Sequence, residues 1–215
     1  MLIRWIGHAC FELKTRWITV VTDPYRLKGM ELPRLRADVV TVSHQHDDHN
    51  NAKGIRYDME IYRTPLVKIK ELTLRSFPTW HDDCGGALRG ENYVTLFDFD
   101  GVKICHAGDL GESCNDRIVQ EIGRVDVLLL PVGGTYTLDA RQAKEYVDRL
   151  RPRVVIPMHY KTARCPLNLA SCEEFAELFD ENDVHRMNQS TFETDLLLKR
   201  RDIGTKLVIL EPENG

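Results

Sequence analysis

Apolar residues recur along the chain at two different spacings, and the spacing changes near residue 115. Before that point they alternate with polar residues or run together in short stretches bounded by turn-forming residues, which is the pattern of β-strands. The Asp100-Gly101 pair between two such stretches favours a hairpin turn. We therefore expect strands at residues 2–6, 10–13, 17–22, 37–42, 92–99 and 102–106, with two or three more between residues 55 and 77.

After residue 115 helical and strand patterns alternate. A helix is expected at residues 139–150, where apolar residues share one stripe. Further helices are expected at residues 115–122, ended by Gly123, and at residues 171–180, capped by Ser171. Strands are expected at residues 125–131, 154–156, 184–187, 195–198 and 206–210. Strands in both halves with interspersed helices predict an α+β fold in which two sheets pack together and are covered by helices.

Composition and length favour one soluble globular domain spanning residues 1–215. Hydrophobic residues make up 42% of the chain and charged residues 29%, which is ordinary for a globular protein. The formal net charge is −4, and Lys and Arg are scattered rather than clustered. Nucleic acid is therefore not the expected partner, because binding it requires a basic surface.

The chain shows no signal for export or membrane insertion. Its first residues lack a charged segment followed by a signal-length apolar run, and the most apolar stretch, residues 125–132, is too short to span a bilayer. The six cysteines are widely spread and form no Cys-x-x-Cys pair. We expect free thiols and a cytoplasmic location.

The highest density of possible metal ligands follows the strand expected at residues 37–42. His44 and His46 lie two residues apart, so both imidazoles point to the same side of an extended backbone. Asp48 and His49 follow where the chain must turn. A purely structural turn would use Gly, Asn or Ser here, because neighbouring histidines repel each other once charged. Neutral imidazoles and carboxylates are instead what a divalent metal ion prefers.

Three other expected strands also end in possible metal ligands. His81 follows the strand after residue 71, Asp109 follows the strand at residues 102–106, and His159 follows the strand at residues 154–156. Each of these residues alone could be structural, and Cys84 is a competing donor beside His81. Ligands in such sheets bind at the carboxyl ends of strands, so the shared placement favours one common site.

Four segments carry a family resemblance: His44-Gln45-His46-Asp47-Asp48-His49, Trp80-His81, His106-Ala107-Gly108-Asp109 and Pro157-Met158-His159-Tyr160. The first fills the pattern His-x-His-x-Asp-His, and all four resemble, in order, metal motifs of the metallo-β-lactamase superfamily of hydrolases. Residues 6–11, 22–24 and 129–134 narrow the resemblance to the subfamily that contains the L-ascorbate-6-phosphate lactonase-like hydrolases. The resemblance runs from residue 1 to about residue 162.

This resemblance implies a four-layer αββα sandwich and a binuclear metal site. It assigns one ion to His44, His46 and His81, and the other to Asp48, His49 and His159, with Asp109 bridging both. Zinc is the first choice of metal, with manganese or iron as alternatives. A metal-bridged hydroxide, oriented by Asp48, would cleave an ester, lactone or phosphodiester bond. Two divalent ions carry more positive charge than Asp48 and Asp109 cancel, and this surplus favours a small anionic substrate. His46 also argues against redox chemistry, because oxygen-reducing di-iron relatives carry Glu at that position.

Several alternatives stay open. The chain could be a non-catalytic metal-dependent sensor or binding module, or a nuclease or phosphodiesterase. Nuclease action ranks lower, because the stretch from His49 to His81 is short and lacks the inserted domains that grip nucleic acids. His8, His106 and Tyr160 are candidates to support the ligands or contact the substrate. His8 could act as general acid, whereas strand alternation could point His106 away from Asp109. The oligomeric state is not specified by the sequence.

Overall fold

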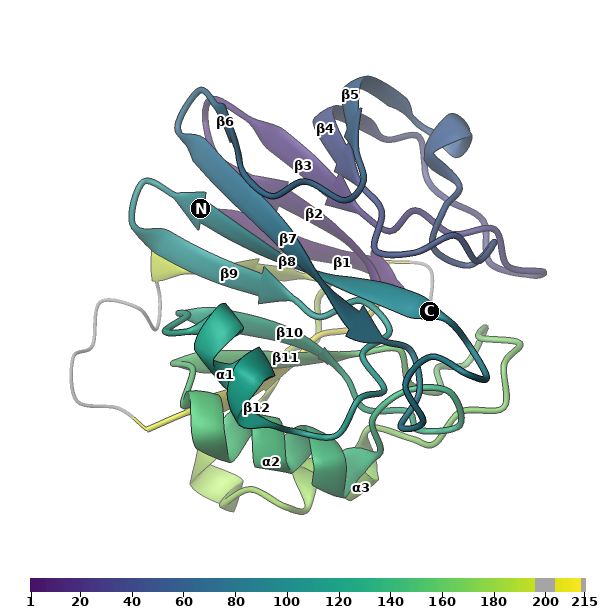
Figure 1. Cartoon of the computed structure of the whole chain (residues 1–215), viewed down its shortest axis with the longest axis vertical. Helices are drawn as coiled ribbons and strands as arrows, with labels where there is room; N and C mark the ends of the chain where they lie inside the picture. The colour runs from purple at the N-terminus through teal and green to yellow at the C-terminus, as the bar shows by residue number, and fades with distance from the viewer. Residues whose placement is uncertain (196–203, 214–215) are drawn as a thin grey trace.

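The computed structural model describes residues 1–195 and 204–213, and its backbone is dominated by two stacked β-sheets (Figure 1). The first sheet has the strand order β13-β1-β2-β3-β4-β5. Its strands are β1 Leu2–Gly7, β2 Cys10–Lys14, β3 Thr19–Thr22, β4 Arg36–Thr41, β5 Arg56–Ile61 and β13 Thr191–Glu193. Strands β3, β4 and β5 pair in parallel, so the carboxyl end of β4 lies inside this sheet rather than at its edge.

The second sheet has the order β12-β14-β11-β10-β9-β8-β7-β6. Its strands are β6 Val67–Ile69, β7 Leu72–Trp80, β8 Glu91–Phe99, β9 Val102–His106, β10 Val127–Pro131, β11 Val154–Met158, β12 Val184–Arg186 and β14 Lys206–Ile209. The pairs from β6 to β9 are antiparallel, and those from β9 to β12 are parallel. The expected hairpin at Asp100-Gly101 therefore joins β8 to β9.

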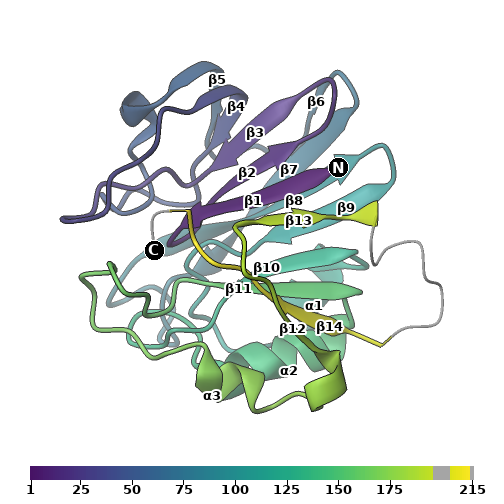
Figure 2. The same cartoon turned by 180° about the vertical axis from the view of Figure 1, so that it is seen from behind.

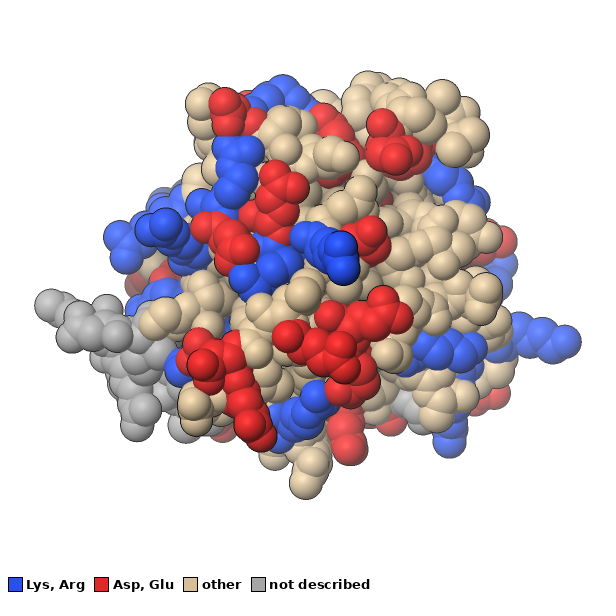
Figure 3. All heavy atoms as spheres, turned by 90° about the horizontal axis from the view of Figure 1, so that it is seen from below, with Lys and Arg blue, Asp and Glu red and all other residues tan. Residues whose placement is uncertain are grey.

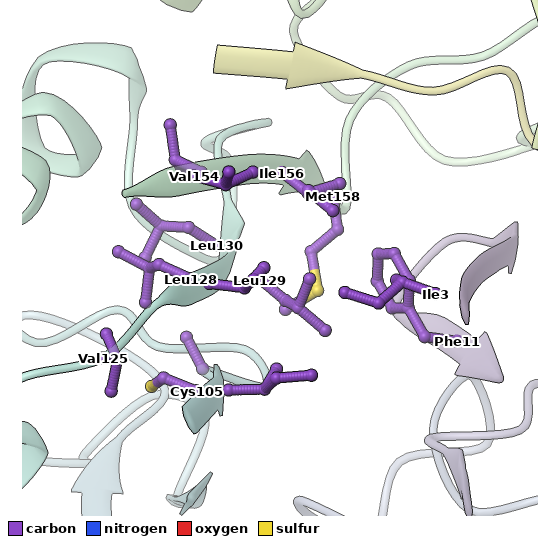
Figure 4. Close-up of a cluster of buried hydrophobic side chains, with 14 of the residues drawn as sticks. Ile3, Phe11, Cys105, Val125, Leu128, Leu129, Leu130, Val154, Ile156 and Met158 are labelled. Atoms are coloured by element: carbon purple, nitrogen blue, oxygen red, sulfur yellow. The ribbon is translucent and has the colours of Figure 1, made fainter. Parts of the chain in front are cut away.

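The main core lies between the two sheets. Figure 4 shows Ile3 and Phe11 from the first sheet facing Leu129 and Met158 from the second. All five residues of β10 and all five of β11 are buried, because the other sheet covers one face and helices cover the other. Burial on both faces explains why these two strands read as continuous apolar runs in the sequence.

Helices cover the outer face of the second sheet (Figure 2). They are α1 Asp116–Ile122, α2 Ala140–Leu150 and α3 Glu173–Ala176. Helix α2 begins at a capping box, in which the Asp139 side chain accepts a hydrogen bond from the Gln142 backbone and the Gln142 side chain accepts one from the Asp139 backbone. None of the helices in the described residues has the length and hydrophobicity needed to cross a membrane.

Loops cover the outer face of the first sheet. The segments between β3 and β5 contain only one short 3₁₀ helix, η1 Ala52–Gly54, among the described residues. They bury Tyr25, Met30 and Leu35 against Val21 and Val40 in a second apolar cluster. The expected α+β fold with two packed sheets is confirmed, and its outermost layer on this side is irregular chain rather than α-helix.

The elements expected after residue 170 differ from those in the structure. The helix expected at residues 171–180 is only α3, which starts after Cys172 and not after Ser171. It tightens into i→i+3 hydrogen bonds at Leu178 and Phe179, and the Asp180 side chain caps the following 3₁₀ helix instead of extending α3. Strand β13 was not expected. The strand expected at residues 195–198 lies almost wholly outside the described residues.

Candidate metal centre

Four strand ends bring the seven predicted metal ligands to one point of the fold. His44, His46, Asp48 and His49 follow β4, whereas the other three ligands follow β7, β9 and β11. The first sheet therefore supplies one half of the cluster and the second sheet supplies the other half. The predicted ligands of the second sheet are His81, Asp109 and His159.

Asp109 lies at the centre of the cluster and is 2% exposed. Its Oδ2 atom is 3.1 Å from Nε2 of both His49 and His81 and 3.2 Å from Nε2 of His159. The distance to His44 Nε2 is 3.8 Å. One carboxylate thus contacts four imidazoles that come from both sheets, which is the position that a bridging ligand would occupy.

The remaining donor atoms fall into two groups around Asp109. His44, His46 and His81 form one group, and their ligand atoms lie within 4.8 Å of one another. Within the same limit, the other group holds Asp48, His49, His159 and the additional residue His8. This division coincides with the two ligand sets that the family resemblance implies. A third group with the same spacing, Asp23, His44 and His49, shares two of these imidazoles.

A buried hydrogen-bond chain fixes which nitrogen of His44 and His49 faces the centre. Asp23 Oδ2 accepts hydrogen bonds from His49 Nδ1, at 2.9 Å, and from Ser43 Oγ, at 2.5 Å. Because Ser43 Oγ donates its only hydrogen to Asp23, it must act as the acceptor in its 3.0 Å hydrogen bond with His44 Nδ1. In their neutral form, both imidazoles therefore carry their hydrogen on Nδ1 and present the Nε2 lone pair to Asp109.

His81 is held in the same tautomer by the backbone of a distant loop. Its Nδ1 donates to the Tyr136 carbonyl at 2.8 Å, so its Nε2 lone pair also faces Asp109. Lone pairs and a carboxylate that converge at 3.1 Å repel one another unless positive charge lies between them. Among the described residues, His44 Nε2, His49 Nε2 and Asp109 Oδ1 are buried without a hydrogen-bond partner. This donor set fits divalent metal ions.

The pKa values of these groups are set by burial and by their attraction to one another. Burial, together with the charge of His49, lowers the pKa of His44 to about 2, so its imidazole is neutral and able to ligate. Burial would raise the pKa of Asp109, but attraction to His159, His49 and His81 holds it well below the ordinary value. Burial would lower the pKa of His49 and of His81, but attraction to the Asp109 carboxylate raises both. The ionised carboxylate therefore favours positive charge on or beside these nitrogens, which a proton or a metal ion can supply.

His8 reaches the site, as the sequence allowed. Its Nε2 lies 3.2 Å from Asp48 Oδ2, and its ring centroid lies 4.2 Å from that of His159. Burial, and then the charge of His159, lower its pKa to about 4, so His8 is neutral and donates the Nε2 hydrogen to Asp48. Hydrogen bonds from Trp5 Nε1 and the His159 amide to the His8 carbonyl hold this turn in place.

His106 and Tyr160 lie elsewhere, which corrects their candidacy as ligand supports or substrate contacts. His106 donates from Nε2 to the Ala9 carbonyl at 2.8 Å, and its Nδ1 accepts from the Gly108 amide at 3.2 Å. Strand alternation turns it into the core, away from Asp109. Tyr160 is buried against Trp5, with ring centroids 5.2 Å apart. Neither residue lines the cavity at the metal centre.

Three supporting residues escaped the sequence analysis: Ser43, Tyr136 and Asn92. Asn92 Oδ1 accepts from the Asp109 amide at 2.9 Å, which fixes the backbone of Asp109. A side chain at Gly108 would collide with Asn92 and Ser43, so the backbone can approach these residues closely only at a glycine. Asn92 could have been noticed as a polar residue within an expected strand, because a buried amide needs hydrogen-bond partners. The Tyr136 contribution is a backbone carbonyl, which leaves no trace in the sequence.

A cavity of about 320 Å³ opens at the metal centre. His46, Asp48 and Asp109 are among the predicted ligands that face it. Its outer walls add two cationic side chains, two apolar ones, a carboxylate and an aromatic ring, from Arg26, Arg89, Leu27, Leu167, Asp47 and Tyr136. The cavity can therefore admit a small molecule to the cluster while holding its charged and apolar parts on different walls.

The chain is similar to proteins of one family along most of its length. A model for a β-lactamase superfamily domain matches residues 2–159. A UPF0173 protein of Pyrococcus abyssi is 30% identical over 187 residues, which cover 75% of this chain and 84% of that protein. A UPF0173 metal-dependent hydrolase of Hyperthermus butylicus is 30% identical over 214 residues, with coverages of 83% and 91%. A Thermotoga maritima structure, named provisionally as a Zn-dependent hydrolase of the metallo-β-lactamase superfamily, is 38% identical, with 99% coverage of both chains and a TM-score of 0.80.

Proposed function

The chain belongs to the metallo-β-lactamase superfamily, and from that membership we propose that it is a metal-dependent hydrolase with a binuclear site. The observation that carries the proposal is the convergence of the Nε2 atoms of His44, His49 and His81 on the Asp109 carboxylate, an arrangement that a bound metal ion would stabilise. When bound, the ions would supply Lewis acidity and would lower the pKa of a water molecule toward neutrality. Zinc is the preferred choice, and manganese or iron fits the same nitrogen and oxygen ligands.

The ligands divide between the two ions as the two donor groups do, with Asp109 shared. One ion would be held by His44, His46 and His81, and the other by Asp48, His49 and His159. Asp23, Ser43 and the Tyr136 carbonyl would keep the imidazoles in the ligating tautomer. Such partners raise the basicity of a ligand and restrict its rotation, so they strengthen metal binding.

Asp48 is the proposed catalytic carboxylate. Its Oδ2 accepts the Nε2 hydrogen of His8, and no donor among the described residues engages its Oδ1. Oδ1 is therefore the atom that would orient the attacking water and take its proton. His8, held by its buried turn, keeps Asp48 facing the cavity and stabilises the ionised form of Asp48. Burial opposes this ionisation, but the hydrogen bond from His8 and the charge of His49 together outweigh it.

The proposed substrate is a small anion with an ester, lactone or phosphodiester bond. The cavity volume of about 320 Å³ suits a small molecule, and Arg26 and Arg89 in its wall favour negative charge. A nucleic acid is not favoured: on the face shown in Figure 3, basic and acidic side chains lie in adjacent small patches without a broad basic surface. The narrower lactonase-like resemblance and the cytoplasmic location stay predictions.

Metal analysis and a hydrolysis panel test the proposal together. Protein purified without chelator should hold about two transition-metal ions per chain at saturation, as a two-metal clamp requires. Zinc- or manganese-loaded protein should hydrolyse members of a panel of p-nitrophenyl esters, lactones and bis(p-nitrophenyl) phosphate. A ceiling of one ion would contradict the binuclear site. Full metal loading without hydrolysis of any ester, lactone or phosphodiester would favour the metal-dependent sensor instead.

A further inference from the structure

A second and larger cavity adjoins the metal centre. Its volume is about 770 Å³, and it shares three wall residues with the cavity at the predicted ligands, namely His81, Arg89 and Tyr136. The shared wall is built from a guanidinium group stacked on a ring, because Arg89 Cζ lies 3.5 Å from the centroid of Tyr136. Any molecule that extends from the metal centre into the larger cavity must pass along this pair.

Both members of the pair are tied to the ligand His81. The Tyr136 carbonyl accepts the His81 Nδ1 hydrogen, so the ring is anchored through its own backbone. Asp82, the residue after His81, accepts hydrogen bonds from the backbone amides of Cys84, Gly86, Leu88 and Arg89. The loop that carries Arg89 is thus wound around a buried carboxylate beside the metal ligand, which fixes the position of Arg89 relative to the site.

The guanidinium of Arg89 has no carboxylate partner among the described residues, although other arginines such as Arg63 and Arg117 have one. The Tyr136 ring covers one of its faces and leaves its N–H edge available. Arg26, the other cation of the metal-site wall, already donates to Asn51 Oδ1 at 3.3 Å. A preorganised, half-buried and unpaired guanidinium beside a catalytic centre is suited to hold an oxyanion through two parallel hydrogen bonds.

We propose that Arg89, stacked on Tyr136, binds the carboxylate or phosphate group of the substrate at the wall between the two cavities and so sets specificity for anions. This inference deepens the proposed hydrolase function and rests on it. The acidic residues of the larger cavity support the placement, since Asp83 and Asp139 would repel an anion that moved further in. The charged group is therefore held next to the ions, and an uncharged part of the substrate extends beyond it.

Inorganic phosphate titrated into zinc-loaded protein by calorimetry tests the inference without any turnover. Arg89→Ala should raise the dissociation constant for phosphate about 10- to 100-fold, the range expected for hydrogen bonds to a charged group. Arg89→Lys should recover only part of the loss, because an ammonium group lacks the planar fork. Arg16→Ala is the matched control, since Arg16 also stacks on a ring, that of Trp17, but lies exposed on the β2–β3 turn. Its phosphate affinity should stay within about twofold of the parent value.

Hydrolysis of two esters of equal length supplies the second readout: p-nitrophenyl butyrate, which is neutral, and p-nitrophenyl hemisuccinate, which ends in a carboxylate. Arg89→Ala should lower kcat/KM for the hemisuccinate about 10- to 100-fold more than it lowers kcat/KM for the butyrate. Equal losses for both esters would overturn the inference, as would unchanged phosphate affinity in Arg89→Ala or absent phosphate binding by the parent. If the parent hydrolyses no substrate of any class, the proposed function fails, and the phosphate titration still decides the role of Arg89.

Discussion

Replacing Asp23 by Asn perturbs the metal centre without touching any predicted ligand. Asp23 is 1% exposed, and its carboxylate accepts three hydrogen bonds, from the Ser43 amide at 2.8 Å, Ser43 Oγ at 2.5 Å and His49 Nδ1 at 2.9 Å. Burial would raise its pKa, but the charge of His106 and the hydrogen bond from His49 hold the pKa below the ordinary value. The group is therefore an ionised acceptor for three donors.

Asn keeps the shape of the side chain but removes the charge and turns one acceptor into a donor. Either His49 Nδ1 or the Ser43 amide then faces an NH₂ group, so one buried donor loses its partner. Losing the charge and one partner should cost about 2–4 kcal/mol of folding free energy. In a chain of this length that is a fall of about 5–15 °C in the melting temperature. Metal affinity should fall about 10- to 100-fold, because His49 and His44 lose the partners that fix their tautomers.

The assay is competition for zinc with a chromophoric chelator, paired with thermal unfolding of the metal-saturated protein. Asp38→Asn is the matched control. Asp38 also accepts a backbone hydrogen bond, from Thr19 at 2.7 Å, and pairs with Lys70 at 2.9 Å, but it lies near the surface away from the ligands. Asp38→Asn should leave zinc affinity unchanged. If Asp23→Asn binds zinc as tightly as the parent, the hydrogen-bond chain does not tune the ligands, and the tautomer argument is wrong.

Four further outcomes are expected. Asp109→Asn should weaken both ions, whereas His81→Ala should weaken mainly one; equal metal titrations for Asp109→Asn and the parent would remove the bridging role. Asp48→Ala should abolish hydrolysis while circular dichroism shows the fold intact, and near-normal turnover with metal bound would refute its catalytic role. Chelator treatment should lower the melting temperature of the parent, and an unchanged value would show that the ions do not stabilise the fold. A chromogenic thiol reagent should modify exposed Cys84 in the folded protein but should reach the four buried cysteines only after unfolding; these are Cys10, Cys105, Cys165 and Cys172. Rapid reaction of the buried cysteines in the folded protein would contradict their placement.

The predicted ligands could be found from the sequence because their chemistry is confined to strand ends. A histidine or aspartate that follows a buried strand lies at the carboxyl edge of a sheet, and the structure brings His81, Asp109 and His159 together at such an edge. The same rule does not decide which of two neighbouring residues turns toward the site. His106 lies three residues before Asp109, yet its ring points into the core and bonds the Ala9 carbonyl.

The residues that orient the ligands were harder to predict, because their roles depend on contacts between distant segments. Ser43 is adjacent to His44 in sequence, but its role depends on Asp23 from the end of β3. Tyr136 acts on His81 through a backbone carbonyl 55 positions away, which any residue type could supply. The short α3 has a local cause instead: Asp180 is more effective as the cap of the next turn than inside a helix.

The site is built across both sheets, so its geometry depends on their packing. His8, in the β1–β2 turn of the first sheet, has φ of 54°, and His159, after β11 of the second sheet, has φ of 51°. Both conformations are unfavourable for residues with a side chain, and each persists only if its surroundings enforce it. The His159 amide bonds the His8 carbonyl at 3.2 Å, so each strained turn holds the other. An ion held by ligands from both sheets would stabilise the same junction, because it would bind only when the two sheets are packed in their native arrangement. Metal binding energy would therefore add to the stability of the sandwich as well as to its chemistry.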